Sequence, residues 1–550
     1  MSASTRIVNG KVYDPKNNIN GEIKEICIEN GKIVDSVSDE ATIINADGMV
    51  VMPGGVDIHC HIAGPKVNLA RKLTPEARRH DVHPSTPFTR SGSGGTTPST
   101  FAAGYRYATL GYTTAMEAAV SPIGARHVLE EFEDTPIIDK GFYVLLGNNI
   151  FLHNLIREKR TEEFDNAVAW WVNATKAYTV KLVNPGGDEP WKGKRNSNVS
   201  DIDEKMGENG DLSPRQIIEA FIKTVNKQGY PHPPHIHCNN LGHSGNYKTT
   251  LETMKTAGDL RAHIAHIQFH SYGGELGKNP TSKATEIAEY VNNHPNITCD
   301  VGQVMFGEST IMTADAPLAY VLKGHSKGKW VNADTECESG CGILPFSYQE
   351  HIYMHTLQWA IGLELFLLSE DPWRIILSTD HPNGGSFMAY PKLIKLLMDE
   401  KFRREEMKRV NQKALLKCTL PELKREYTLN EIAIITRAGP ARALGLETKG
   451  HLGVGADADI TIYDSMDDKE MMFSAPRYVI KSGNTMIDNH EFRTDSTGKL
   501  FHITPEHDTK IEEVLKPFFE SYYSIEFSNY AVDDRYLHEH EIVKTTQGKE

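Results

Sequence analysis

Short apolar runs alternate with longer helical patterns through the middle of the chain. Eight runs rich in apolar and β-branched residues stand out: VDIHCHIAG, YTTAMEAAV, GFYVLLGNN, AYTVKLVNPGG, HPPHIHCNN, RAHIAHIQFHSYGG, NITCDVGQVMF and WRIILSTDHPNGG. A connecting helix is clearest in SPRQIIEAFIKTVNKQG, where Ser213 can cap the first turn and Pro214 fits inside it. Such alternation indicates βα units around a parallel sheet. Eight units predict an α/β fold, a TIM-like (β/α)₈ barrel.

The two ends of the chain follow a different pattern. Residues 1–50 contain short alternating strands with Asn-Gly turns at Asn9 and Asn30, and similar strands return in ADITIYDS and RYVIKSGNTMI. Because neither set alone can bury a core, we expect the N- and C-terminal segments to combine in one composite β-sandwich. The predicted organisation is residues 1–52 and 446–490 for the sandwich, 53–445 for the barrel, and 491–550 for a tail that packs on the domain or on a partner protein.

The predicted barrel region is longer than the about 250 residues that a plain barrel needs, so loop insertions must supply the excess. One insertion spans residues 63–104 and the other spans residues 184–213, and both are rich in glycine and polar residues. Loops that follow barrel strands form the catalytic rim, which makes both insertions candidate lids or substrate clamps. The first insertion carries a basic cluster, which consists of Lys66, Arg71, Lys72, Arg78, Arg79 and Arg90.

Composition narrows the class of protein. The 550 residues include 59 Lys and Arg against 73 Asp and Glu, a formal net charge of −14 that argues against nucleic acid or an anionic membrane as the main partner. The seven cysteines are scattered and form no C-x-x-C pair, as in reduced cytosolic proteins. No apolar run approaches the about 18 residues that cross a bilayer. We therefore expect a cytoplasmic protein without a membrane span.

Polar side chains recur where the predicted barrel strands end. His59 and His61 are two residues apart in a strand and therefore point to the same side. We prefer His237 to His235 because it lies nearer the strand end, whereas His263 and His270 compete with His266, and Lys176 competes with Lys181. Barrel geometry directs these ends to one mouth. The candidate metal site comprises His59, His61, Lys181, His237, His266 and Asp380.

These residue types suit a pair of metal ions. Zinc binds imidazole nitrogen and carboxylate oxygen, and four histidines with one aspartate exceed the needs of a single ion. Two ions about 3.5–4 Å apart would use the whole set and would require a bridging anion. A lysine amine cannot bridge two cations, but a carbamate formed from the amine and CO₂ is in effect a carboxylate. Asp380 can also be read as an ordinary helix cap.

Together these residues resemble the amidohydrolase superfamily, with its H-x-H pair, carboxylated lysine, two further histidines and final aspartate. Longer blocks are similar to the A subunits of formylmethanofuran dehydrogenase and of the bacterial formyltransferase/hydrolase complex. They include DVHPSTPFTRSGSGGTTPST, KLVNPGG, HCNNLGHSGNY, QFHSYGG, DVGQVMFGESTIMTADAP, WAIGLELFLL and LSTDHPNGG. The resemblance extends over about residues 1–490, and within it KLVNPGG favours Lys181 and HIAHIQ favours His266.

The resemblance implies a cytoplasmic hydrolase that interconverts N-formylmethanofuran and water with formate and methanofuran. It implies two Zn²⁺ ions, one held by His59, His61 and Asp380, the other by His237 and His266, with N6-carboxylysine at Lys181 as the bridge. Asp380 would also be the catalytic proton carrier. The implied partners are the other subunits of the complex and a methanofuran-type carrier, whose glutamyl tail the basic cluster could bind. Two alternatives remain open: another metal-dependent amidohydrolase, such as a cyclic amidase or N-deacylase, and a non-catalytic scaffold of the same fold.

Overall fold

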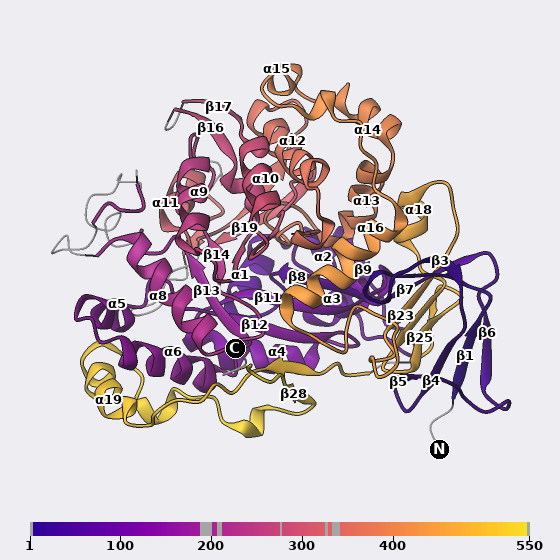
Figure 1. Ribbon diagram of the computed structural model, residues 1–550, viewed down its shortest axis with the longest axis horizontal. Helices are drawn as coiled ribbons and strands as arrows, with labels where there is room; N and C mark the ends of the chain where they lie inside the picture. Colours follow the sequence, from indigo (N-terminus) through magenta and orange to yellow (C-terminus); the bar gives the residue numbers. More distant parts are fainter. Residues whose placement is uncertain are drawn as a thin grey trace.

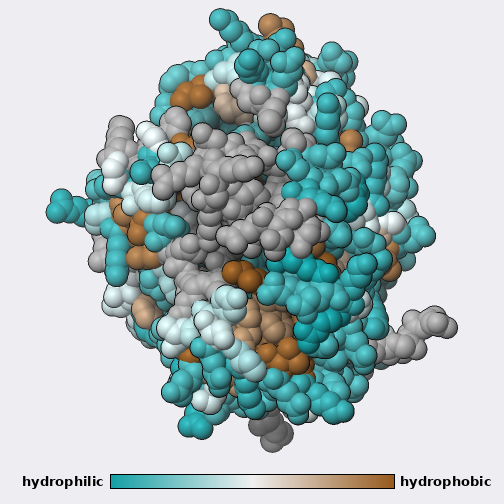
Figure 2. Space-filling model, turned by 90° about the vertical axis from the view of Figure 1, so that its left-hand side faces the viewer, coloured by the Kyte–Doolittle hydropathy of each residue, from teal (hydrophilic) through white to brown (hydrophobic). Residues whose placement is uncertain are grey.

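The computed structural model describes residues 4–187, 201–205, 212–275, 278–324, 328–332, 342–494 and 496–546. A barrel occupies the centre of the molecule, a pair of β-sheets lies at one end, and the C-terminal tail runs along the barrel (Figure 1). On the face shown in Figure 2, the described surface is mostly hydrophilic and its apolar residues lie in small separate groups. Within the described residues, no helix has the length and apolar character needed to cross a membrane.

Eight parallel strands form the barrel, one in each of the predicted runs, so the predicted (β/α)₈ fold is confirmed. Neighbouring strands follow one another in chain order, and the segment after β22 meets β8 through a parallel bridge between Cys60 and His381, which nearly closes the barrel. There the backbone N–H of His61 donates to the carbonyl of His381 at 2.7 Å. The strands are β8 (Gly55–Cys60), β11 (Tyr112–Val120), β12 (Asp139–Leu145), β13 (Thr179–Val183), β14 (His235–His237), β15 (Ala262–Ile264), β18 (Ile297–Asp300) and β22 (Ile375–Ile376).

The barrel strands are buried on both faces, which explains their nearly continuous apolar sequences. The predicted connecting helix is α8 (Pro214–Lys227), and the Ser213 side chain accepts from the backbone N–H of Gln216 in a capping box. Its apolar stripe, which includes Phe221, is buried against the barrel core. Local sequence signals and tertiary packing therefore agree in this unit.

Strands from both ends of the chain form one seven-stranded sheet. In it β7 (Met49–Pro53) pairs with β23 (Ile460–Asp464), and Val51 is opposite Ile462. A second sheet contains β1 (Thr5–Val8), β4 (Ile26–Glu29), β5 (Lys32–Val34) and β6 (Thr42–Asn45), all from the N-terminal segment. Apolar residues of both segments share one core, in which Ile7 and Ile28 pack with Ile460.

The described part of the C-terminal tail packs on the barrel of its own chain. Strand β27 (Leu500–His502) pairs with β12, and α19 (Ile511–Tyr522) contacts α6 (Thr161–Thr175). Beyond α19, Phe527 stacks on Trp170 of α6 with ring centroids 5.3 Å apart. These aromatic contacts explain why the tail sequence mixes charged residues with Phe and Tyr.

Insertions build the region beyond the C-terminal ends of the barrel strands. The insertion predicted at residues 63–104 contains α1 (Pro65–Leu73) and α2 (Ala77–His80), while the one predicted at 184–213 lies partly outside the described residues. The structure also contains a third insertion, between β18 and β22, which was not predicted as a separate unit. It contains β19 (Gly307–Thr313), α11 (Ala316–Lys323) and β21 (Gly342–Tyr348), and β19 and β21 pair antiparallel.

Candidate metal centre

A cavity of about 1050 Å³ opens at the C-terminal ends of the barrel strands. Its polar floor comes from strands distant in sequence, and its walls come largely from the insertions. The structure brings all six predicted site residues to this cavity. They are His59 of β8, His61 just after it, Lys181 of β13, His237 at the end of β14, His266 after β15 and Asp380 after β22.

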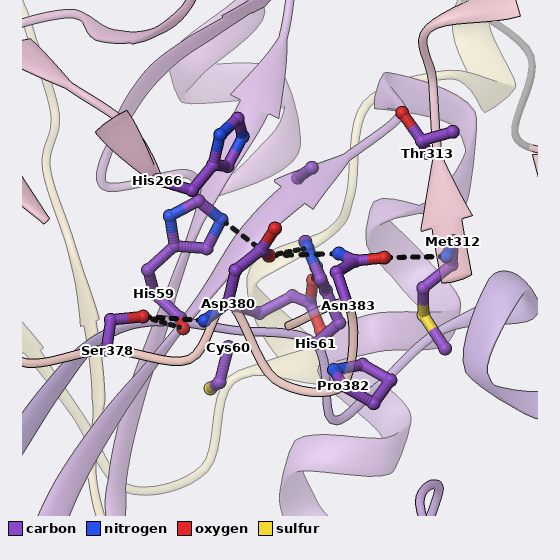
Figure 3. A network of polar contacts seen from close by, with 12 residues as sticks. His59, Cys60, His61, His266, Met312, Thr313, Ser378, Asp380, Pro382 and Asn383 are labelled. Carbon is purple, nitrogen blue, oxygen red and sulfur yellow. Dashed lines mark hydrogen bonds and ion pairs between the residues drawn. The ribbon is translucent and has the colours of Figure 1, made fainter. Parts of the chain in front are cut away.

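Asp380 lies between the two histidines of the H-x-H pair (Figure 3). Its Oδ1 is 3.1 Å from Nε2 of His59 and 3.1 Å from Nε2 of His61. The backbone at Asp380 has a φ of 49°, and its N–H donates to Ser378 Oγ, which in turn donates to the carbonyl of His59. Burial opposes ionisation of Asp380, but His59 and His266 outweigh it and hold the pKa of Asp380 well below its ordinary value.

Two buried carboxylates hold the outer nitrogens of these histidines. Nδ1 of His59 lies 3.0 Å from Oδ2 of Asp300, and Nδ1 of His61 lies 2.7 Å from Oε1 of Glu117. Asp300 also accepts from the backbone N–H of His266 at 3.0 Å. Such carboxylates orient metal-binding imidazoles and select their tautomer. The sequence analysis missed both, although each is a charged residue in an otherwise buried strand.

A second group of imidazoles stands beside the first. The ring centroids of His237 and His266 are 4.6 Å apart, and His266 is 5.2 Å from His59. Among the described residues, two groups of closely spaced donors include His266: one with His59 and Asp380, the other with His237 and His270. The buried Nδ1 of His266 has no hydrogen-bond partner in the described structure. The donor set therefore suits two neighbouring cations.

Lys181 is an unusual buried amine. It is 1% exposed, and its Nζ has no hydrogen-bond partner among the described residues. Burial lowers the pKa of Lys181 to about 8, although Asp300 and Asp380 oppose that shift. A neutral amine is the form that attacks CO₂, and burial shifts Lys181 toward that form.

Three of the competing residues make other contacts, whereas His270 stays in the donor group with His237 and His266. His235 lies deeper in the barrel, where its Nε2 is 3.1 Å from Nδ1 of His59 and its Nδ1 is 3.1 Å from Nε2 of His232. Nε2 of His263 is 3.2 Å from Oδ2 of Asp300. Lys176 forms a surface ion pair with Asp534 at 2.5 Å. The geometry therefore favours His237, His266 and Lys181 as the cavity-facing members.

Comparisons with known proteins identify the family of this chain. The amidohydrolase family model matches residues 42–487, which is most of the chain. The chain belongs to the amidohydrolase family. The chain is also 43% identical over 561 residues to Protein FwdA of Methanocaldococcus jannaschii, with 98% of each chain covered. The resemblance inferred from the sequence is thus confirmed.

Two further comparisons match this chain to proteins of one bacterium. The chain is 37% identical over 544 residues to the A subunit of the formyltransferase/hydrolase complex Fhc of Methylorubrum extorquens, with 96% of each chain covered. The crystal structure of FhcABCD from that organism, in complex with methylofuran, aligns with a TM-score of 0.91 and 35% identity. That alignment covers 98% of this chain and 100% of the other. This amidohydrolase therefore shares almost its whole length with both relatives.

The cavity of this amidohydrolase has a polar floor and an apolar wall. Asn383 lies at the junction, because its Nδ2 donates to Asp380 Oδ1 at 3.0 Å and its Oδ1 accepts from the backbone N–H of Met312 at 2.7 Å (Figure 3). Such a cavity can enclose the apolar part of a bound molecule and place a polar bond of that molecule next to Asp380 and the histidines. The apolar wall includes Leu145, Val183, Leu241, Phe269, Leu318 and Phe346.

Proposed function

We propose that this chain hydrolyses N-formylmethanofuran, or the formyl derivative of a methanofuran analogue, to formate and the free amine, and catalyses the reverse condensation. It would act as the A subunit of a formylmethanofuran dehydrogenase or formyltransferase/hydrolase complex. The observation that carries the proposal is the convergence of all six predicted donors on one cavity, in a chain similar over almost its full length to the A subunit of Fhc.

The residues fit two zinc ions. His59, His61 and Asp380 would hold one ion, and His237 and His266 would hold the other. N6-carboxylysine at Lys181 would bridge them, a role supported by the unpartnered buried Nζ of this residue. Bound zinc would supply an acidified water and polarise the formyl oxygen at this site.

Asp380 is the proposed proton carrier. Its carboxylate is buried and ionised, and it lies at the cavity floor beside the two histidines. It would accept a proton as water attacks the formyl carbon, and then deliver that proton to the nitrogen as the C–N bond breaks. Amines leave poorly without a proton. Asn383 would hold the carboxylate in place through its hydrogen bond.

The rest of the cavity would select the carrier. The apolar wall suits a furan or aryl group next to the formylated nitrogen. Lys66 and Arg90 of the basic cluster are paired with Glu117 and Asp134, so exposed members such as Lys72 and Arg79 would bind the glutamyl carboxylates of the tail. Support comes from the rim, where Lys329 lines the cavity and forms an ion pair with Glu76, directly before α2.

The decisive experiment measures formate release from N-formylmethanofuran by the purified complex, together with zinc bound per chain. Asp380→Asn should lower kcat by about 10²- to 10⁴-fold, the range expected for loss of a general acid–base group. Lys181→Ala should lose both zinc and activity. Lys176→Ala is the matched control, because this lysine pairs on the surface with Asp534 and should leave both measurements unchanged.

Two results would reject the proposal. Wild-type complex that binds zinc but cleaves a cyclic amide or an N-acyl amino acid faster than the formyl substrate would indicate a different amidohydrolase. Unchanged formate release after Asp380→Asn and Lys181→Ala would show that the chemistry takes place in one of the other subunits. The present chain would then serve as a scaffold.

A further inference from the structure

Asp315 is a buried acid that the sequence analysis did not identify. It comes from the insertion between β18 and β22, directly before α11, and it is 2% exposed. One carboxylate oxygen, Oδ1, accepts from the backbone N–H of Leu318 at 3.0 Å and caps the helix. The backbone N–H of Asp315 donates to Thr313 Oγ1 at 3.0 Å. The position of its side chain is therefore well determined.

The other oxygen of Asp315 faces a predicted metal ligand. Oδ2 lies 3.4 Å from Nε2 of His237, which is ion-pair range without a hydrogen bond, and His243 is also within electrostatic reach of Asp315. A buried carboxylate is costly unless a donor meets it, and a protonated Nε2 is such a donor. With the proton at Nε2, the free electron pair of the imidazole is at Nδ1.

The same pairing occurs at the other two histidines of the site. His59 and His61 each direct one nitrogen toward Asp380 and the other toward a separate carboxylate, Asp300 or Glu117. Among the described residues, the donor group that contains His237 includes His266 and His270 but not Asp315. Asp315 thus faces His237 as the other two carboxylates face their histidines, but it does so through Nε2 rather than Nδ1 and at a longer distance.

We propose that Asp315 is a positioning residue, which holds the His237 ring through Nε2 so that Nδ1 is the nitrogen available to the second metal ion. The inference rests on the proposed two-metal function. It also links two parts of the site, because the helix that Asp315 caps carries Leu318, Val321 and Leu322 on the cavity wall. The same side chain therefore positions both a substrate-facing helix and a metal-binding imidazole.

The variant Asp315→Asn tests the capping of α11 and the positioning of His237 separately. Asparagine is as good a helix cap as aspartate, but its neutral amide is a poorer acceptor for the His237 N–H. When the intact complex with Asp315→Asn is dialysed against increasing chelator, one of the two zinc ions should be released. This should occur at a free chelator concentration about 10- to 100-fold lower than in the wild type. The other zinc ion, which His59, His61 and Asp380 would hold, should be retained as in the wild type. We expect kcat to fall while KM stays within about twofold.

The matched control is Asp399→Asn, which alters the capping aspartate of α14 (Glu400–Met407) away from the cavity. It should retain both zinc ions. If Asp315→Asn also retains both with wild-type affinity and only the thermal midpoint moves, Asp315 is a helix cap alone and the inference fails. A wild-type chain that never binds two zinc ions would instead reject the proposed function.

A measurement on the wild type avoids any folding defect of the variants. In a crystal structure of the zinc-loaded complex, we expect zinc at Nδ1 of His237 and a hydrogen bond from Nε2 to Asp315. Zinc bonded directly to Asp315, or to Nε2 of His237, would overturn the inference.

Discussion

Nδ1 of His61 and Oε1 of Glu117 lie 2.7 Å apart, although Glu117 lies in β11 and His61 follows β8. Glu117 also accepts from the backbone N–H groups of Ile62 and Ala63 and from Nζ of Lys66. Burial opposes ionisation of Glu117, but Lys66 and His61 outweigh it and lower the pKa of Glu117 to about 2. This carboxylate therefore fixes the loop that carries the H-x-H pair as well as one of its imidazoles.

Glu117→Gln should weaken metal binding without emptying the site. The amide can still accept one hydrogen bond, but the negative charge opposite His61 and Lys66 is lost. We expect zinc affinity to fall by about 10- to 100-fold, as for other residues that orient metal ligands. Chelator titration with metal analysis measures this. Glu219→Gln, on the exposed face of α8, is the control, and equal zinc affinity in both variants would contradict the role given to Glu117.

Activity should depend on CO₂ if Lys181 is carboxylated. Burial lowers the pKa of its amine to about 8, which favours the neutral amine that a carbamate requires, and a carbamate would be lost when CO₂ is removed. Protein stripped of metal at low pH and reloaded with zinc in CO₂-free buffer should be inactive and should recover on addition of bicarbonate. Incubation with ¹³C-bicarbonate should give a carbamate signal in carbon NMR spectra that is absent from Lys181→Ala. Full activity in CO₂-free buffer would exclude a carbamate bridge.

Removing the two positive charges of Arg78 and Arg79 should raise KM for a carrier with a glutamyl tail. The double variant Arg78→Ala/Arg79→Ala changes the short helix α2, which follows Glu76. Its kcat should be little affected, because the predicted metal ligands are unchanged. Steady-state kinetics at low ionic strength gives both constants. Arg404→Ala/Lys408→Ala removes the same charge at α14 and should leave KM unchanged. An unchanged KM in the Arg78→Ala/Arg79→Ala variant would show that the glutamyl tail binds at another part of the protein.

A buried ion cluster joins the barrel to the sandwich. Nζ of Lys449 is 2.5 Å from Asp139, 2.9 Å from Asp457 and 2.7 Å from Asp459, and it is almost fully buried. Lys449→Met should lower the free energy of unfolding by about 3–5 kcal/mol, because three buried carboxylates lose their common partner. Denaturant unfolding at pH 7 measures this. Lys223→Ala, in an exposed pair, should cost less than about 1 kcal/mol.

The contribution of this cluster should depend on pH. Burial opposes ionisation of Asp457, but Lys449 and Lys32 outweigh it and lower the pKa of Asp457 from 3.8 to about 2. A lowered carboxyl pKa stabilises the folded state fully above the unfolded value, and that stability is lost as the pH falls through the folded value. The wild type should therefore lose stability between about pH 4 and 2, and the gap to Lys449→Met should narrow there. A gap that stays constant over this range would contradict the ionic role.

Several features could be predicted because they depend on local patterns. Each of the eight apolar runs contains a barrel strand, and Ser213 caps the helix that its capping-box sequence predicts. In a barrel of parallel strands, the residues at strand ends meet at one rim whatever their separation in sequence. This is why His59 and Asp380, more than three hundred positions apart, could be placed together from the sequence.

Other features depend on contacts that no local pattern encodes. The insertion from β19 to β21 was not predicted as a small sheet. Its paired strands are separated by a long connection, and their pairing depends on where they lie beside the cavity. Asp300, Glu117 and Asp315 were also missed. An acidic residue in a strand or at a helix start has several ordinary roles, and only the position of a histidine opposite it reveals this one.

The sequence by itself determined the order of the eight barrel strands, the barrel, the joining of strands from the two chain ends and the predicted site residues that reach the cavity. Periodicity, turn residues and long family-specific blocks carry that information within short stretches of chain. Only the tertiary structure decided that His235 and His263 lie beneath the site, that Lys181 is an unpartnered buried amine, and which carboxylate faces each imidazole. Those properties arise from burial and from distances between side chains on different strands, which depend on packing in three dimensions.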